Sequence, residues 1–115
     1  MPDIPSALKL IKARYGKRKL VEIAEVLHAI LRNIVENPSE QRFRRVDLSS
    51  QYFKSRLEPY IGVHAIFRIL MFQRSGPNLI FSPADVSSLQ EEMLKLSKVI
   101  RLQSKSYLIF YSNHW

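Results

Sequence analysis

The residues whose types could support chemistry are concentrated between positions 33 and 48. An asparagine amide can bind a peptide backbone, and an arginine guanidinium can pair with a carboxylate through two parallel hydrogen bonds. The residues of interest in this stretch are Asn33, Phe43 and three arginines, Arg42, Arg44 and Arg45. The combination favours an extended, acidic partner. The alternative is that the stretch is only the corner between a helix and a strand.

The rest of the chain offers little that could catalyse a reaction. The absence of Cys excludes a disulfide, a zinc-thiolate site and a cysteine nucleophile. His28, His64 and His114 are isolated in sequence, and three glycines are too few for a phosphate-binding loop. We therefore expect no catalytic residues, no metal and no cofactor, and we interpret the chain as a binding module rather than an enzyme.

Composition bounds the class of protein and its partners. A length of 115 residues with 46% hydrophobic residues predicts one globular domain. No apolar run approaches the roughly 20 residues of a membrane span, and the first residues do not resemble a signal peptide. We expect a monomer in the cytoplasm or the nucleus. The net charge of +8 favours nucleic acid, an anionic membrane surface or an acidic protein segment as the partner.

Two dense basic patches, residues 12–19 and 42–45, keep a second function open. They could make the chain a small nucleic-acid-binding domain, whose affinity would fall steeply with salt. We find no stacking-aromatic motif and no recognition-helix signature, which disfavours nucleic acid. The alternative is that these patches have no specific partner and only provide a cationic surface that keeps a small domain soluble.

Hydrophobic periodicity predicts two helices before the polar stretch. A first helix ends at Gly16, and a second runs from about Arg18 to Glu36 with one long apolar stripe. The residue before Pro38 is disfavoured in helices, so the second helix should end near Asn37. Residues 43–48 then resemble a strand, with alternate side chains on opposite faces.

The second half of the chain predicts a hairpin between helices. Ser49 and Ser50 offer N-cap oxygens for a short helix over 51–57, and Pro59 suits the first turn of another that reaches about Leu70 with Gly62 inside it. Residues 71–74 and 78–81 are predicted strands around a Ser-Gly-Pro turn. The sequence Ser82-Pro83-Ala84-Asp85 predicts the start of a last helix that reaches about Leu102.

This pattern indicates an α+β fold, in which helices pack around a small antiparallel sheet of roughly three strands. We divide the chain into a short N-terminal helix with a basic linker (1–17), the main domain (18–103) and an apolar tail (104–115). The window Tyr107–Tyr111 carries no charge, so we expect it to dock on the core or to add a strand. A further possibility is that this tail mediates self-association.

The order of these elements and motifs along the chain resembles that of the PUB (PUG) domain over roughly positions 20 to 101. The resemblance is carried by Asn-Ile-Val-Glu-Asn-Pro at the end of the second helix and by Phe-Arg-Arg-Val-Asp-Leu after it. It continues through Phe53, Arg56, Leu57, Pro59, Gly62, Leu70-Met71-Phe72 and Asn78–Phe81. PUB domains are adaptors that capture the C-terminal tail of the AAA ATPase valosin-containing protein or similar short motifs. The resemblance implies such a role in ubiquitin and ER-associated degradation pathways.

The resemblance also implies roles for individual residues. Asn33 would bind the peptide backbone, Phe43 would stand where the family usually has tyrosine, and Phe72 would line an apolar slot. Arg42, Arg45 and Arg56 would face the acidic groups of the tail. Three departures bear on the ligand: Phe43 lacks the hydroxyl of tyrosine, Met71 occupies a glycine position beside the slot, and Asp47 occupies a position that is commonly basic.

Overall fold

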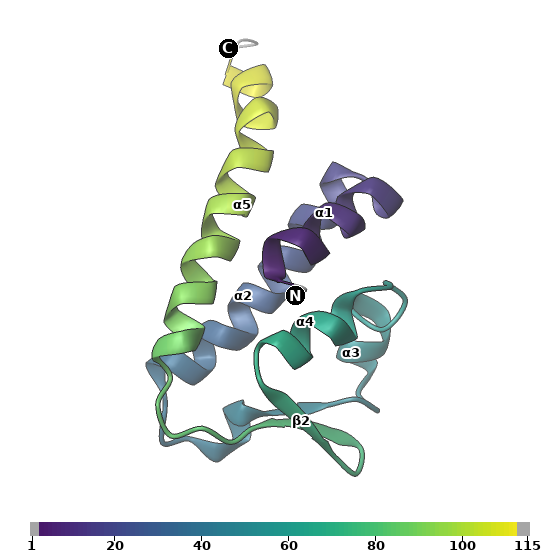
Figure 1. Ribbon diagram of the computed structural model, residues 1–115. Coiled ribbons are helices and arrows are strands. Elements are labelled where there is room, and N and C mark those ends of the chain that lie inside the picture. The colour runs from purple at the N-terminus through teal and green to yellow at the C-terminus, as the bar shows by residue number, and fades with distance from the viewer. Residues whose placement is uncertain (1–2, 113–115) are drawn as a thin grey trace.

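The computed structural model describes the backbone of residues 3–112 and the side chains of residues 3–103. The elements follow in the order α1 (Ile4–Tyr15), α2 (Lys17–Glu36), the 3₁₀ helix η1 (Gln41–Arg44), β1 (Arg45–Asp47), α3 (Gln51–Arg56), α4 (Val63–Ile69), β2 (Phe72–Ser75), β3 (Asn78–Phe81) and α5 (Ser87–Ser112). Helices surround one three-stranded antiparallel sheet (Figure 1). The expected α+β class is confirmed.

The first two helices are bounded by the signals that the sequence carries. Asp3 caps α1, because its Oδ1 accepts a hydrogen bond from the backbone N–H of Ser6 at 2.8 Å. Gly16, at φ 91°, ends α1 and lies directly before α2. Asn37 ends α2, and Pro38 follows it. Both predicted helices are confirmed to within a few residues.

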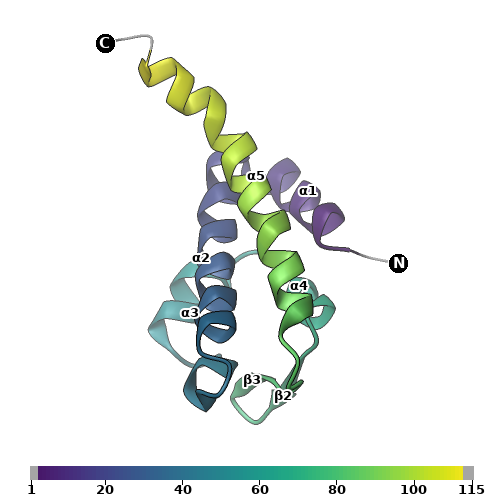
Figure 2. The same ribbon diagram turned by 90° about the vertical axis from the view of Figure 1, so that its left-hand side faces the viewer.

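The core lies between α2 and its neighbours. Helix α2 packs along α5 and against α1, as the two views of the molecule show (Figures 1 and 2). Its predicted apolar stripe is at most 2% exposed at every position: Leu20, Ile23, Ala24, Leu27, Leu31 and Ile34. Burying a Leu or Ile side chain contributes about 1.5–3 kcal/mol, so this face stabilises the packing of α2 substantially.

The sheet lies below the helices, at the end of the molecule opposite the far end of α5 (Figure 1). Its strand order is β1-β3-β2, and both pairs are antiparallel. The predicted hairpin is confirmed, with Phe72 opposite Phe81 and Arg74 opposite Leu79. Helix α4 packs on β2, where the rings of Phe67 and Phe72 meet edge to face at a centroid distance of 5.1 Å.

The predicted strand over 43–48 is wrong at its beginning. Phe43 and Arg44 lie in η1, and the strand contains only residues 45–47. The cause is local: the N–H of Phe43 donates to the carbonyl of Glu40 at 3.2 Å, while the Arg44 side chain folds back onto the carbonyl of Pro38. These bonds close a tight turn that an extended strand could not form.

The predicted helix from Pro59 to Leu70 is also too long. Helix α4 begins at Val63, and Gly62 precedes it with φ 103°, a left-handed conformation. Turn bonds from Tyr60 N–H to Leu57 O and from Val63 N–H to Tyr60 O occupy the preceding segment. Gly62 is therefore not a weak interior position. It is the residue that allows the chain to turn into α4.

The last helix begins later and ends later than the sequence predicted. It starts at Ser87, and Asp85 rather than Ser82 satisfies a free N–H of its first turn, since Asp85 Oδ1 accepts the Ser87 N–H at 2.9 Å. The carbonyl of Pro83 accepts a hydrogen bond from the Arg44 guanidinium. The backbone of the predicted tail is helical to Ser112 and does not form a strand, since no Gly or Pro interrupts it. Within the described range, none of the helices is long and apolar enough to cross a membrane.

Candidate functional site

A cavity of about 190 Å³ opens where the last turns of α2 meet η1, β1 and α3. It brings together four of the predicted site residues: Asn33, Arg42, Phe43 and Arg45. The remaining lining residues are Ile30, Val46, Asp47, Ser50, Tyr52, Phe53 and Leu57. We call this space the Asn33–Phe43 cavity. Residues from four separate elements form it, so its shape depends on the fold rather than on one motif.

Asn33 presents a free amide at the mouth of this cavity. Its backbone carbonyl is occupied, since it accepts hydrogen bonds from the backbone N–H and the Nδ2 of Asn37, both at 3.1 Å. Its exposed side chain has no hydrogen bond to any described residue. Asn37 therefore caps the helix, and the Asn33 amide remains able to donate to and accept from a peptide backbone.

An aromatic ring and a cation form the adjacent wall. Phe43 is half-buried and packs against the core, while the Cζ atom of Arg42 lies 4.8 Å from its ring centroid. Arg42 is also within 3.8 Å of Glu40, but the two side chains are mostly exposed. Exposed pairs contribute about 0–1 kcal/mol, so a ligand carboxylate could replace Glu40 at little cost.

Arg44 fixes this wall in place. It is 5% exposed, and no carboxylate balances it among the described residues. Its Nε and Nη2 atoms donate to Pro38 O at 2.9 and 2.8 Å, and Nη1 donates to the carbonyls of Phe81 and Pro83. The guanidinium thus joins η1 to the end of β3. The sequence analysis treated Arg44 only as part of a basic patch, because the amino-acid sequence does not indicate which of the three arginines is buried.

Asp47 adds a negative charge to the cavity. Its Oδ1 accepts hydrogen bonds from the N–H and the hydroxyl of Ser49, at 2.9 and 2.6 Å. These bonds, aided by the nearby charge of Arg45, lower the pKa of the Asp47 carboxyl below its usual value. The carboxylate is therefore charged at neutral pH and opposes the attraction that the arginines exert on an acidic ligand.

Three predicted site residues lie elsewhere. Phe72 does not line the Asn33–Phe43 cavity; it is 3% exposed and packs between Phe67 and Phe81. Met71 is 61% exposed and has a φ of 74°. Arg56 lines a neighbouring cavity of about 450 Å³ between α2 and α3.

Tyr52, which the sequence analysis did not single out, joins the two cavities. It lines both of them and is 48% exposed. The Cζ atom of Arg56 lies 4.8 Å from its ring centroid. An exposed aromatic residue on a short helix next to a basic one was the only signal that could have indicated it.

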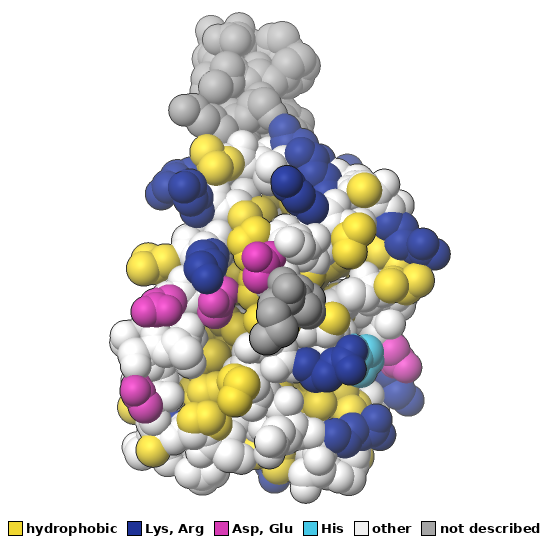
Figure 3. Space-filling model, viewed as in Figure 1, with side chains coloured by type: hydrophobic (Ala, Val, Ile, Leu, Met, Phe, Trp, Pro, Cys, Tyr) yellow, Lys and Arg dark blue, Asp and Glu magenta, His cyan; other side chains and the backbone are white. Residues whose placement is uncertain are grey.

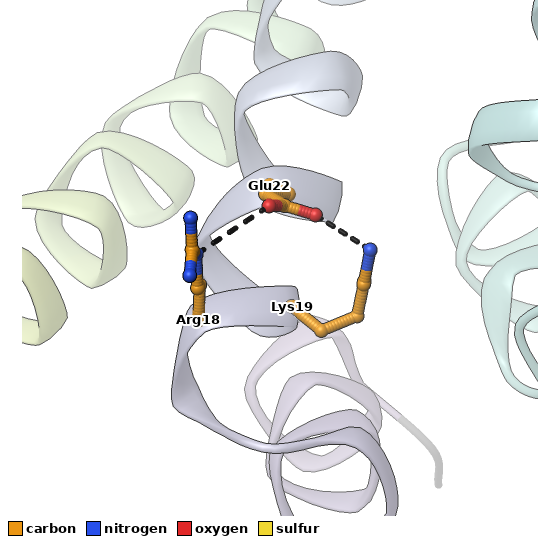
Figure 4. Close-up of polar contacts among 3 residues, drawn as sticks. All are labelled: Arg18, Lys19 and Glu22. Atoms are coloured by element: carbon orange, nitrogen blue, oxygen red, sulfur yellow. Dashed lines mark hydrogen bonds and ion pairs between the residues drawn. The ribbon is translucent and has the colours of Figure 1, made fainter.

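The basic patch over residues 12–19 is partly neutralised by its own helix. Glu22 lies 2.6 Å from Lys19 Nζ and 4.0 Å from Arg18 Nε, as Figure 4 shows. Lys19 also lies over the ring of Tyr60, at 5.2 Å from its centroid. Part of the charge that suggested nucleic-acid binding is therefore already paired.

The fold and the cavity define a small interaction module, and the described residues contain no cluster of His, Asp and Glu that could hold a metal ion. The sequence model of the PUB domain matches residues 17–105, so the chain belongs to the PUB domain family. This confirms the resemblance. The PUB domain is a non-catalytic protein-interaction module.

Two curated proteins are similar to this chain in sequence. The peptide-N(4)-(N-acetyl-beta-glucosaminyl)asparagine amidases of Mus musculus and Rattus norvegicus are each 27% identical to this chain over 97 residues. The similarity covers 82% of this chain and 15% of each amidase. The chain therefore spans only a small part of the length of these relatives, and the similarity concerns that part alone.

Proposed function

We propose that this domain is an adaptor that binds a short acidic peptide with an apolar or aromatic anchor in the Asn33–Phe43 cavity. The C-terminal tail of valosin-containing protein is the specific partner we propose, or a similar linear motif in ubiquitin pathways. One observation carries the proposal: the free amide of Asn33, the ring of Phe43 and the exposed cations Arg42 and Arg45 line one cavity. An acidic tail with one anchor needs this combination of groups.

The size of the cavity indicates how such a peptide would bind. A cavity of about 190 Å³ has room for one large side chain but not for a folded segment. One anchor residue would fill it, and the acidic residues would lie outside against Arg42 and Arg45. Exposed ion pairs add little, so the anchor should dominate the affinity. A contact this small should have a Kd on the order of micromolar or weaker.

The direct test is an NMR titration of the isotopically labelled domain with an acidic peptide that ends in a free carboxylate and contains leucine and tyrosine. Chemical shifts should change most at Asn33, Phe43 and Tyr52. The same peptide with leucine and tyrosine replaced by alanine should cause much smaller shifts. Changes spread along residues 12–19, or no saturable change, would contradict the proposal.

A further inference from the structure

A second groove, of about 490 Å³, lies between α4 and the β2–β3 hairpin. It shares no lining residue with the Asn33–Phe43 cavity. Its floor is apolar and formed by Phe67, Phe72 and Leu79, each at most 7% exposed. Because these residues belong to the core, the floor is rigid.

The walls of this groove are basic. Arg68 on α4 and Arg74 on β2 both line it, together with the exposed imidazole of His64, and no Asp or Glu does. The Arg68 guanidinium has no hydrogen bond or ion pair to a described residue. Arg74 uses only its Nε, which donates to Gly76 O at 3.0 Å. Figure 3 shows basic side chains beside a histidine over this region, with one acidic side chain beyond the histidine.

The groove also reaches a free edge of the sheet. Strand β2 pairs with β3 on one side only, since the strand order is β1-β3-β2. The consecutive residues Phe72, Gln73 and Arg74 all line the groove, although alternate residues of a strand point to opposite faces. The groove therefore meets the edge of β2 as well as one face. An edge strand can accept an extended segment through its unpaired backbone groups.

From this geometry we propose that the groove is a second docking site, for an extended acidic segment of a partner protein. Carboxylates of the segment pair with the guanidinium groups of Arg68 and Arg74, and one apolar side chain rests on the floor. Charge complementarity selects the partner, because two arginines face the groove with no acidic residue among those that line it. The segment needs no free C-terminus, unlike the tail proposed for the Asn33–Phe43 cavity.

A nucleic acid would satisfy the charge but not the shape of the floor. The rings of Phe67 and Phe72 pack against each other edge to face, with an interplanar angle of 78°, and both are buried. Neither ring offers an open face on which a base could stack. The described residues of the groove thus favour carboxylates and an apolar side chain over phosphates and bases.

The test uses a peptide that lacks a free C-terminus, so that the two sites are separated. The probe is acetylated and amidated Glu-Glu-Glu-Leu-Phe-Glu-Glu-Glu, titrated into the labelled domain in NMR. We expect saturable shifts at Arg68, Gln73 and Arg74. The double variant Arg68→Glu/Arg74→Glu should weaken binding at least tenfold, and Arg68→Gln/Arg74→Gln should weaken it less, because it removes charge without reversing it. The spectrum of each variant checks that it is folded.

The matched control is Lys9→Glu/Lys98→Glu, which changes the net charge equally at exposed positions that line neither site. It should weaken binding less than threefold, and Asn33→Ala should leave it unchanged. An equal loss in the control would overturn the proposal, because binding would then follow net charge. Shifts centred on Asn33 and Phe43, or tighter binding of a 12-residue oligothymidylate to the groove, would overturn it as well. None of these results decides whether the tail peptide binds in the Asn33–Phe43 cavity.

Discussion

The guanidinium of Arg44 donates a hydrogen bond to the carbonyl oxygen of Phe81 at 3.3 Å, although the two residues are 37 positions apart. The same side chain holds Pro38 and Pro83, so one buried cation links the segment after α2 to the segment before α5. Phe43 is the neighbour of Arg44 in η1, and its ring faces the cavity. The position of the proposed anchor pocket therefore depends on a residue outside it.

Replacing Arg44 should destabilise the domain strongly. Arg44→Met removes the donor and leaves the carbonyls of Pro38, Phe81 and Pro83 without their partner, and we expect a loss of about 3 kcal/mol in the free energy of unfolding. Urea denaturation monitored by circular dichroism measures it. The free energy of unfolding of Arg44→Lys should lie between those of the parent and of Arg44→Met, because one ammonium group cannot reach all three carbonyls. A loss under about 1 kcal/mol for Arg44→Met would show that the link is not structural.

Removing the free amide of Asn33 should weaken peptide binding without affecting the fold. The amide has no partner among the described residues, so Asn33→Ala should leave the unfolding midpoint unchanged. The affinity for the acidic tail peptide should fall by about 1 kcal/mol, or roughly fivefold in Kd, by calorimetry. Arg32→Ala, on the preceding residue of α2 and outside the cavity, is the control. An equal effect of both variants would remove the specific role of Asn33.

Neutralising Asp47 should strengthen the same interaction. Asp47→Asn keeps an acceptor for Ser49 but removes the charge that opposes an acidic ligand, so we expect a severalfold lower Kd at low salt. The pKa of the Asp47 carboxyl is lowered below its usual value of 3.8, so the group is fully ionised between about pH 6 and pH 8. The gain in affinity from Asp47→Asn should therefore not vary across this pH range. Added salt should reduce it. A Kd that is unchanged at low salt would place the ligand's acidic groups away from Asp47.

Replacing Met71 by glycine should stabilise the domain. Met71 is the only non-glycine residue in the described range with a positive φ, at 74°, and its side chain is 61% exposed. Glycine adopts this conformation without strain and loses little buried surface here, so Met71→Gly should add about 1 kcal/mol to the unfolding free energy. Met71→Ala keeps the Cβ atom and should add nothing. Equal thermal midpoints for all three proteins would show that the backbone is not strained at this position.

The cap of α5 should make stability depend on acid. Hydrogen bonds from the hydroxyl and the N–H of Ser87 lower the pKa of Asp85 in the folded state. Its contribution is therefore complete above the usual value of 3.8 and is lost as the pH falls through the lower folded-state pKa. Asp85→Ala should melt at a lower temperature than the parent at pH 7, and the difference should shrink near pH 2. A difference that stays constant across this range would exclude the charged cap.

Much of the fold could be predicted because its signals are local and strong. The apolar stripe of α2 repeats over about four turns, Gly16 and Asn37 bound the helix, and the turn between β2 and β3 carries glycine and proline. The failures at residue 43 and before Val63 came from tight turns, whereas the failure at Ser82-Pro83 involves a distant group. Arg44 binds the carbonyl of Pro83, and Asp85 caps α5, so the Ser82-Pro83 signal does not begin a helix.

The site was only partly predictable for the same reason. Asn33, Arg42, Phe43 and Arg45 are close in sequence, and the structure brings them together in one cavity. Phe72 was assigned to the cavity by resemblance, yet it pairs with Phe81 across the hairpin and lies under α4. Which aromatic residue is buried depends on tertiary packing, and no spacing rule separates Phe43 from Phe72.

Helix α1 lies before the segment that matches the PUB family, yet Ile4, Leu8 and Ile11 are among the most buried side chains in the molecule. The Cβ atom that any other residue would add at Gly62 would come 3.7 Å from Ile11, which shows how closely the loop before α4 approaches this helix. A fragment that begins at residue 17 would therefore expose to water the apolar surface that α1 covers, and we expect it to aggregate. The segment that matches the family, residues 17–105, is therefore shorter than the segment that must be expressed to obtain a folded and soluble domain.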